Sequence, residues 1–121
     1  MPRILIVDDE AAILNMLETI FKLASFEVET ASSAGEAKSR LQEMSFDVVM
    51  TDMRMEKPNS GYDVVRTARQ LQPRPAIAIL TAFPISPTDW RPSGADALLI
   101  KGMEVLDLPR KLQALLKTRA A

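Results

Sequence analysis

The sequence predicts an α/β domain built on a mostly parallel sheet that helices cover on both faces. Short apolar runs rich in β-branched residues alternate, over 121 residues, with longer segments whose apolar residues recur at helical spacing. The apolar runs show no polar alternation, which is typical of strands buried on both faces. Strands that alternate with helices are expected to run parallel, because right-handed βαβ crossovers return each strand in the same direction.

The order of the elements follows from these two patterns. The expected strands are residues 3–7, 26–30, 48–51, 76–80 and 97–100, and helical spacing occupies residues 13–24, 33–44, 60–71 and 108–116. Asp8 or Asp9 can cap the first helix. Ser33 and Glu36 form a capping-box pattern before the second helix, and Pro109 is tolerated in the first turn of the last one.

One crossover breaks the pattern. Pro84, Pro87 and Pro92 crowd the segment between Thr81 and Gly94, where a fourth helix is expected. A proline inside a helix costs about 3 kcal/mol, so we expect a short helical turn there at most. Trp90 lies in the same stretch and either packs over a surface groove or anchors a partner protein.

Composition excludes several classes of function. The chain has no cysteine and no histidine, so disulfide frameworks, thiol catalysis, Cys-ligated zinc and histidine-based catalysis are excluded. Its 15 basic and 16 acidic residues nearly balance, which gives no general attraction to nucleic acid or to an anionic membrane. The amino-terminal residues do not resemble a signal peptide, and no apolar run is long enough to span a membrane. We therefore expect a cytoplasmic protein.

Polar residues follow four of the apolar strands directly. They are Asp8 with Asp9, then Asp52, Thr81 and Lys101. Taken singly, each has a structural explanation as a helix cap, turn residue, strand-end hydroxyl or solvated charge. The carboxyl ends of parallel strands meet at one edge of the sheet, however, and this is where such folds bind ligands. Their joint placement therefore favours a single pocket.

The chemistry of that pocket follows from its carboxylates. Three carboxylates at one edge repel each other, and a hard divalent cation such as Mg²⁺ relieves the repulsion. A carboxylate can also act as a nucleophile and form an aspartyl-phosphate. The Thr81 hydroxyl and the Lys101 ammonium could then bind the charged phosphoryl oxygens.

These residues carry a family resemblance over nearly the whole chain. The motifs are Ile4-Leu-Ile-Val-Asp-Asp-Glu10, Val48-Val-Met-Thr-Asp52, Leu80-Thr-Ala82 and Gly94-Ala-Asp…Leu99-Ile-Lys101. They resemble the receiver domain of response regulators from bacterial two-component systems, in the superfamily of chemotaxis receivers. The resemblance implies a doubly wound, flavodoxin-like parallel sheet of five strands in the order 2-1-3-4-5, with an irregular or shortened fourth helix in this chain.

The resemblance also implies a role for each site residue. Asp52 would be the phosphoacceptor and would bind Mg²⁺ together with Asp8, Asp9 and the backbone carbonyl of Arg54. Thr81 would be the switch hydroxyl, and Lys101 would contact the phosphoryl group. The phosphoryl donor would be a phosphohistidine on a histidine kinase or phosphotransfer protein.

Besides the proline-rich segment from Pro84 to Pro92, which replaces the fourth helix, the chain departs from the family pattern at three places. Leu98 stands where the family usually has an aromatic switch residue or histidine, so that relay is absent or altered. Gly102 replaces a proline that follows a cis bond, and we expect the Lys101–Gly102 bond to be trans, or cis and strained. Glu56 replaces another usual proline in a slightly longer loop that leads to Gly61.

The sequence thus predicts a phosphoacceptor signalling domain, residues 1–121, that is not an enzyme toward external substrates. It would act on a downstream protein target or on an output domain outside this sequence, without direct contact to nucleic acid or membrane. A receiver-fold adaptor that works without phosphorylation is the main alternative. A phosphatase with an aspartate nucleophile is disfavoured, because Arg54 stands where such enzymes generally need a second acid.

Overall fold

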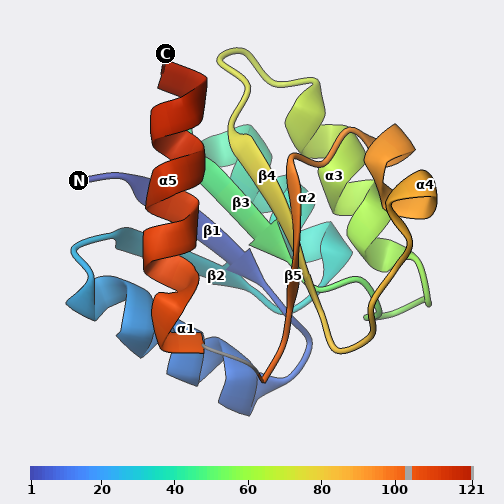
Figure 1. Ribbon diagram of the computed structural model, residues 1–121, viewed down its shortest axis with the longest axis horizontal. Coiled ribbons are helices and arrows are strands. Elements are labelled where there is room, and N and C mark those ends of the chain that lie inside the picture. Colours follow the sequence, from blue (N-terminus) through green and yellow to red (C-terminus); the bar gives the residue numbers. More distant parts are fainter. Residues whose placement is uncertain (103–104, 121) are drawn as a thin grey trace.

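A computed structural model describes residues 1–102 and 105–120 and has a parallel sheet at its centre (Figure 1). The strands are β1 (Arg3–Val7), β2 (Glu27–Ala31), β3 (Val48–Thr51), β4 (Ala76–Thr81) and β5 (Ala97–Ile100). All pairs are parallel, and the strand order is β2-β1-β3-β4-β5, as predicted. β2 begins one residue later than expected, and Phe26 before it packs edge-on against Phe21 with 5.0 Å between ring centroids.

Helices cover both faces of this sheet. They are α1 (Ala11–Leu23), α2 (Ala34–Glu43), α3 (Ser60–Arg69), α4 (Pro87–Trp90) and α5 (Leu108–Ala120). In Figure 1, α1 and α5 lie on one face, and α2, α3 and α4 lie on the other. Short 3₁₀ turns occupy Arg91–Ser93 and Val105–Asp107. The element order is the one that the alternating sequence pattern predicted.

The core forms two layers, one on each side of the sheet. Along β1, Leu5 and Val7 contact the layer under α2 and α3, while Ile4 and Ile6 contact the layer under α1 and α5. All four are almost fully buried. Because both faces are covered, an unbroken apolar run is the pattern that such a strand needs.

The two helix caps give different outcomes. Ser33 caps α2 as predicted, because its hydroxyl accepts a hydrogen bond from the Glu36 backbone N–H at 3.0 Å. The prediction that Asp8 or Asp9 caps α1 is wrong. Glu10 is the N-cap residue, and its side chain makes no capping hydrogen bond. Asp8 instead accepts the Glu10 backbone N–H at 3.0 Å and points to the edge of the sheet.

The fourth helix is short, as its prolines predicted. α4 has four residues and passes into the 3₁₀ turn, which ends at Gly94 with a φ of 95°. Trp90 corrects our expectation, because its side chain is neither a lid on a surface groove nor an exposed anchor. It is 8% exposed and belongs to the core layer under α2 and α3. A single turn of helix is thus fixed by one large buried ring.

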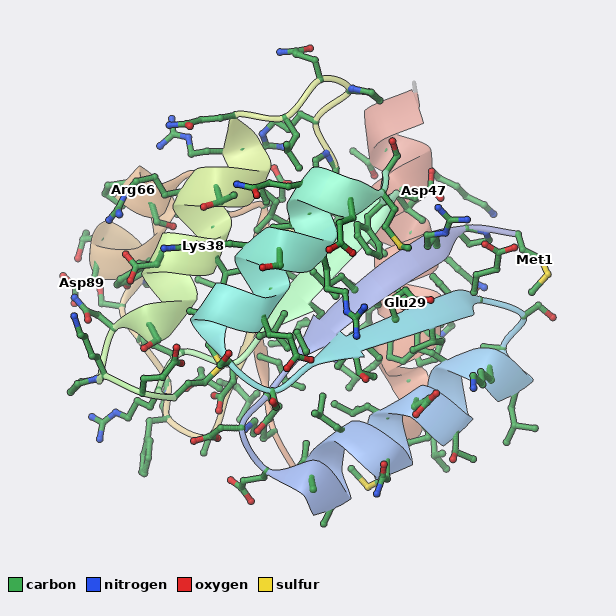
Figure 2. The ribbon with its side chains drawn as sticks, turned by 180° about the vertical axis from the view of Figure 1, so that it is seen from behind. Met1, Glu29, Lys38, Asp47, Arg66 and Asp89 are labelled. Atoms are coloured by element: carbon green, nitrogen blue, oxygen red, sulfur yellow. The ribbon has the colours of Figure 1, made fainter. Side chains whose placement is uncertain are left out.

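The Lys101–Gly102 peptide bond is trans. In the described part of the chain, the one cis bond joins Gln72 and Pro73. The outer face of α2, α3 and α4 carries charges of both signs, such as Lys38 on α2, Arg66 on α3 and Asp89 on α4 (Figure 2). None of the helices described over residues 1–102 and 105–120 combines the length and the apolar character needed to cross a membrane.

Candidate functional site

Three charged residues continue the sheet by one residue beyond the strand ends. The Asp8 N–H donates to Ala31 of β2 at 3.1 Å, and the Asp52 N–H donates to Val7 of β1 at 2.8 Å. The Lys101 N–H donates to the Thr81 carbonyl at 2.8 Å. These backbone hydrogen bonds extend the parallel ladders, so the three side chains start from fixed positions at the same edge.

The side chains meet there. The Lys101 ammonium lies 2.7 Å from Asp8 Oδ2 and 3.1 Å from Asp52 Oδ2, so it bridges the two carboxylates. The other oxygen of Asp52 accepts the Met53 backbone N–H at 2.8 Å. Asp8 is 1% exposed and Asp52 is 7% exposed. A buried carboxylate pair with one cation is a costly arrangement that needs further compensation.

The pKa values of Asp52 and Lys101 are shifted by this burial and by the contacts between the two side chains. Burial raises the pKa of Asp52, and the negative charge of Asp8 adds to the rise, while contact with Lys101 and the Met53 amide opposes it. Burial acts to lower the pKa of Lys101. Its contacts with Asp8 and Asp52 outweigh burial, and its pKa is raised. Lys101 is therefore a cation at neutral pH.

An open pocket of about 330 Å³ gives access to this cluster. Asp9, Glu10, Asp52, Arg54, Met55, Thr81, Ala82, Phe83 and Lys101 line it. The buried Thr81 hydroxyl accepts the Phe83 backbone N–H at 3.3 Å. The Arg54 guanidinium lies over the Phe83 ring at 5.4 Å from its centroid and so borders the opening.

The donor set fits a hard divalent cation. Asp8, Asp9 and Glu10 can each offer a carboxylate oxygen, and these oxygens lie within 4.8 Å of one another. Asp8 Oδ2 is buried, and apart from the ion pair with Lys101 at 2.7 Å it has no hydrogen-bond partner among the described residues. Oxygen ligands of this kind suit Mg²⁺. Asp8, Asp9 and Glu10 can therefore offer oxygen ligands to such an ion.

The structure thus places most of the sequence-predicted residues in the lining of one pocket, with Asp8 joined to it through Lys101, whereas Leu98 packs against the core. Asp8, Asp52 and Lys101 are in direct contact, and Asp9, Arg54 and Thr81 surround the opening. The roles of these residues as ligands and acceptor stay predictions. Sequence reasoning did not select Glu10 or Phe83. Glu10 continues the acidic run of Asp8 and Asp9, whereas no pattern marked Phe83.

In the loop after Asp52, the Glu56 side chain contacts α2, which the sequence did not predict. Both carboxylate oxygens of Glu56 lie 3.1 Å from the backbone nitrogen of Ala34, the first residue of α2. Backbone N–H groups of Glu56 itself, Ala34 and Gly35 hold the pKa of this carboxyl below its usual value. Met53 belongs to the core in the same loop, and Met55 packs against it.

Comparison with known proteins decides what this pocket belongs to. The family model described as the response regulator receiver domain matches residues 4–113 of the chain. The chain belongs to the response regulator receiver family. It is a signalling domain, the phosphoacceptor module of two-component systems, and not an enzyme of the ordinary kind.

Relatives of this receiver domain include longer regulators. The transcriptional regulatory protein PrrA of Mycobacterium leprae is 33% identical over 99% of this chain, which spans 52% of that protein. The alginate biosynthesis transcriptional regulatory protein AlgB of Pseudomonas aeruginosa is 38% identical over 82% of the chain, or 22% of its own length. The chain thus spans about half or less of these curated relatives.

Solved structures of similar proteins share the whole fold. The chemotaxis response regulator CheY4 of Vibrio cholerae has a TM-score of 0.84 and 30% identity, covering 95% of this chain and 98% of its own. The response regulator TrrA of Thermotoga maritima, solved in complex with Mg²⁺-BeF, has a TM-score of 0.84 and 28% identity, covering 95% and 99%. These agree with the doubly wound fold that the motifs predicted.

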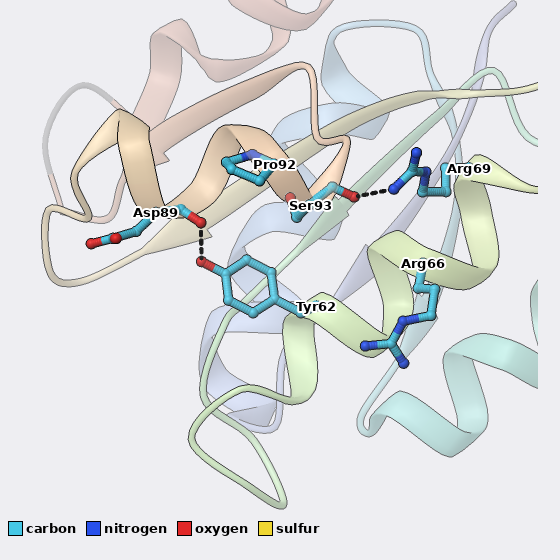
Figure 3. A pocket seen from close by; sticks show the side chains of 6 residues that line it. All are labelled: Tyr62, Arg66, Arg69, Asp89, Pro92 and Ser93. Carbon is cyan, nitrogen blue, oxygen red and sulfur yellow. Dashed lines mark hydrogen bonds between the residues drawn. The ribbon is translucent and has the colours of Figure 1, made fainter.

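The receiver domain has a second hollow of about 350 Å³ between α3 and the α4 segment (Figure 3). The Tyr62 hydroxyl donates to the Asp89 carbonyl at 3.4 Å, and Arg69 donates to the Ser93 carbonyl at 3.1 Å. Though slightly larger than the acidic pocket, it holds none of the site residues. Its polar groups fasten the short α4 to α3.

Proposed function

We propose that this receiver domain accepts a phosphoryl group on Asp52, beside a Mg²⁺ held by Asp8, Asp9, Asp52 and the Arg54 carbonyl. One observation carries the proposal: Lys101 bridges Asp8 and Asp52 at the edge where both carboxylates extend the strand ladders. An acceptor needs a carboxylate that is fixed, partly desolvated and next to positive charge. Asp52 meets these conditions.

The reaction transfers the group between two partners. An oxygen of Asp52 forms a bond to phosphorus while the P–N bond of a phosphohistidine on a kinase or phosphotransfer protein breaks. The electron pair leaves with the imidazole nitrogen, which then takes up a proton. Bound Mg²⁺ would neutralise charge on the phosphoryl oxygens and on the carboxylates.

Residues of this chain supply the remaining interactions. The Lys101 ammonium lies 3.1 Å from Asp52 Oδ2 and can form an ion pair with a phosphoryl oxygen once the group is attached. The Thr81 hydroxyl can turn to another phosphoryl oxygen, which would release the Phe83 N–H that it now accepts. We propose that this release, at Phe83, replaces the aromatic relay that Leu98 cannot perform.

A phosphodonor experiment tests the proposal. The protein is incubated with acetyl phosphate and Mg²⁺, and the intact mass is measured. We expect a gain of one phosphoryl group that hydroxylamine removes, as it does from an acyl phosphate. Asp52→Asn should abolish the gain, and Asp89→Asn, at an exposed aspartate of α4, should keep it.

The alternatives predict other results. An adaptor that works without phosphorylation is favoured by Leu98, whose partly buried side chain packs into the core and has no group to exchange partners. Absence of any mass gain with either acetyl phosphate or a phosphorylated kinase would support the adaptor. Turnover of many equivalents of a phosphomonoester would instead support the phosphatase.

The scope of the signalling unit is also a proposal. We propose that residues 1–121 act as one receiver domain in the cytoplasm, phosphorylated by a kinase and acting on a protein target or on an attached output domain. The regulators among its relatives support a kinase partner. The balanced charge of the chain supports contacts with protein and not with nucleic acid or membrane.

A further inference from the structure

We propose that Glu56 is a positioning residue, whose carboxylate ties the loop after Asp52 to the first turn of α2 and so holds the Arg54 backbone ready for Mg²⁺. The inference rests on the proposed function, because it assigns the Arg54 carbonyl to the metal. It concerns a residue that has no part in the acidic pocket itself. Glu56 lies outside the pocket lining and acts on it through the backbone.

The loop is fixed at both ends. At its start, the Asp52 N–H donates to Val7, and the Met53 carbonyl accepts the Gly61 N–H at 2.8 Å. At its end, the Lys57 N–H donates to the Ser60 hydroxyl at 2.8 Å. These bonds anchor the loop to the sheet and to α3, and they leave residues 54–56 between the two anchors.

In the middle of the loop, Met55 packs against the core and Arg54 lies over the Phe83 ring, and Glu56 adds a hydrogen-bonded contact. The Met55 N–H donates to the Lys57 carbonyl at 3.1 Å, a bond within the loop. Over residues 54–56, and counting only the described chain, Glu56 makes the one hydrogen-bonded connection to another element. It reaches the Ala34 N–H with both oxygens at 3.1 Å, across 22 residues of sequence.

The end of α2 is a favourable place for this carboxylate. The first N–H groups of a helix have no partner within the helix, and the helix end carries partial positive charge. The Ser33 hydroxyl accepts the hydrogen bond of the Glu36 N–H, and the Ala34 N–H donates to the Glu56 carboxylate. The proline usual at this position in the family has no side-chain oxygen that could make this contact.

The contact of Glu56 with α2 orders the loop before Mg²⁺ binds. Arg54 lies two residues before Glu56, so a tie at Glu56 restricts the backbone conformations open to the Arg54 carbonyl. A loop that is ordered before binding loses less conformational entropy when the ion arrives. Linkage is reciprocal, so Mg²⁺ binding should in turn strengthen the contact between Glu56 and Ala34.

The experiment follows Mg²⁺ binding by NMR in the full chain. A Mg²⁺ titration of the wild type gives a Kd from the backbone amide signal of Met53, and the Ala34 amide signal should shift along with it. In Glu56→Ala we expect Kd to rise about fivefold and the Ala34 shift to disappear. Glu56→Gln keeps an oxygen acceptor without the charge and should fall between these two.

Two controls separate positioning from helix stability. Glu43→Ala removes an exposed glutamate at the far end of α2 and should leave the Mg²⁺ Kd unchanged. Ser33→Ala removes the other cap at the same helix end without touching the loop, so it should lower the Tm but not the Mg²⁺ affinity. An equal loss of Mg²⁺ affinity in Ser33→Ala and Glu56→Ala would overturn the inference.

The remaining outcomes are also decisive. Mg²⁺ binding that Glu56→Ala leaves unchanged would overturn this inference alone and leave Asp52 phosphorylation standing. Failure of the wild type to bind Mg²⁺ would overturn the proposed function and this inference with it. Weakened binding together with loss of the Ala34 response, in Glu56→Ala only, would establish the positioning role.

Discussion

The accepting edge (the ends of β1 and β3, with Asp8 and Asp52) and the reporting side (residues 87–100, which form α4, the 3₁₀ turn and β5) are built differently. β1 and β3 have hydrogen-bonded neighbours on both sides, and their apolar side chains are almost fully buried. β5 is an edge strand, and all four of its residues are half-buried. Lys101 directly follows β5 and reaches back to the accepting edge.

This contrast indicates which parts of the receiver domain can vary. The phosphoryl transfer that we propose at Asp52 needs fixed side-chain positions, and the central strands supply them through their backbone hydrogen bonds. The reporting side lies at the edge of the sheet, and its contacts include the buried Trp90 ring, the hydrogen bonds of Tyr62 and Arg69, and the ion pair of Arg74 with Asp96 at 3.1 Å. We therefore expect substitutions on the reporting side to leave the positions of Asp8 and Asp52 unchanged.

Trp90→Ala should give the largest effect and tests this separation directly. Removing a buried tryptophan costs about 4 kcal/mol, which urea unfolding measures. Under conditions where the variant is folded, Asp52 should still accept a phosphoryl group from acetyl phosphate. Phe83→Ala, at a ring that is 60% exposed, should cost far less stability. Loss of phosphorylation in folded Trp90→Ala would show that the accepting edge depends on the packing of the reporting side.

Gly61→Ala should affect both stability and phosphoryl acceptance. A Cβ at Gly61 would collide with the Asp52 carbonyl oxygen and lie 2.7 Å from the Met53 Cα, so backbone must move. We expect a loss of about 3 kcal/mol and much slower phosphorylation, measured by unfolding and by intact mass. Gly35→Ala is the matched control, because its Cβ would meet only the Ser33 hydroxyl oxygen, at 4.0 Å. Normal phosphorylation of Gly61→Ala would contradict the tight packing behind Asp52.

Gly102→Ala should have a smaller effect, limited to backbone strain. The φ of Gly102 is 83°, and no atom of the described residues lies within 4 Å of a Cβ placed there. The left-handed conformation alone costs about 1–2 kcal/mol for a residue with a Cβ. A loss larger than that of Gly61→Ala, measured in the same urea series, would contradict the open surroundings of Gly102.

Asp52→Asn should raise the stability of the metal-free protein at pH 7 by about 1 kcal/mol, because the buried charge beside Asp8 disappears. Burial raises the pKa of Asp52 above its ordinary value of 3.8. Ionisation of Asp52 therefore destabilises the folded state, an effect that is absent below that value and develops as pH rises through the raised pKa. Thermal unfolding should show a higher Tm for Asp52→Asn than for the wild type at pH 7, and this difference should vanish in acid. A difference of equal size at pH 7 and in acid would rule out ionisation of Asp52 as its cause.

Much of the molecule was predictable because the determining interactions are local or periodic. The strands followed from apolar runs, the Ser33 cap of α2 from its capping box, and the short α4 from the prolines at 84, 87 and 92. Placing the polar residues at strand ends was enough to gather them at one edge. Predictions failed where a side chain had alternatives in space, as with Trp90 and with the expected cap of α1.

The parallel α/β fold and the edge that carries Asp8, Asp52, Thr81 and Lys101 could be predicted from the residues alone. The bridge from Lys101 to two carboxylates and the contact of Glu56 with the first turn of α2 became visible only in the folded chain. The physical reason is range. Periodicity and helix-breaking act over a few residues, whereas these contacts depend on distances between segments that only the packed core brings together.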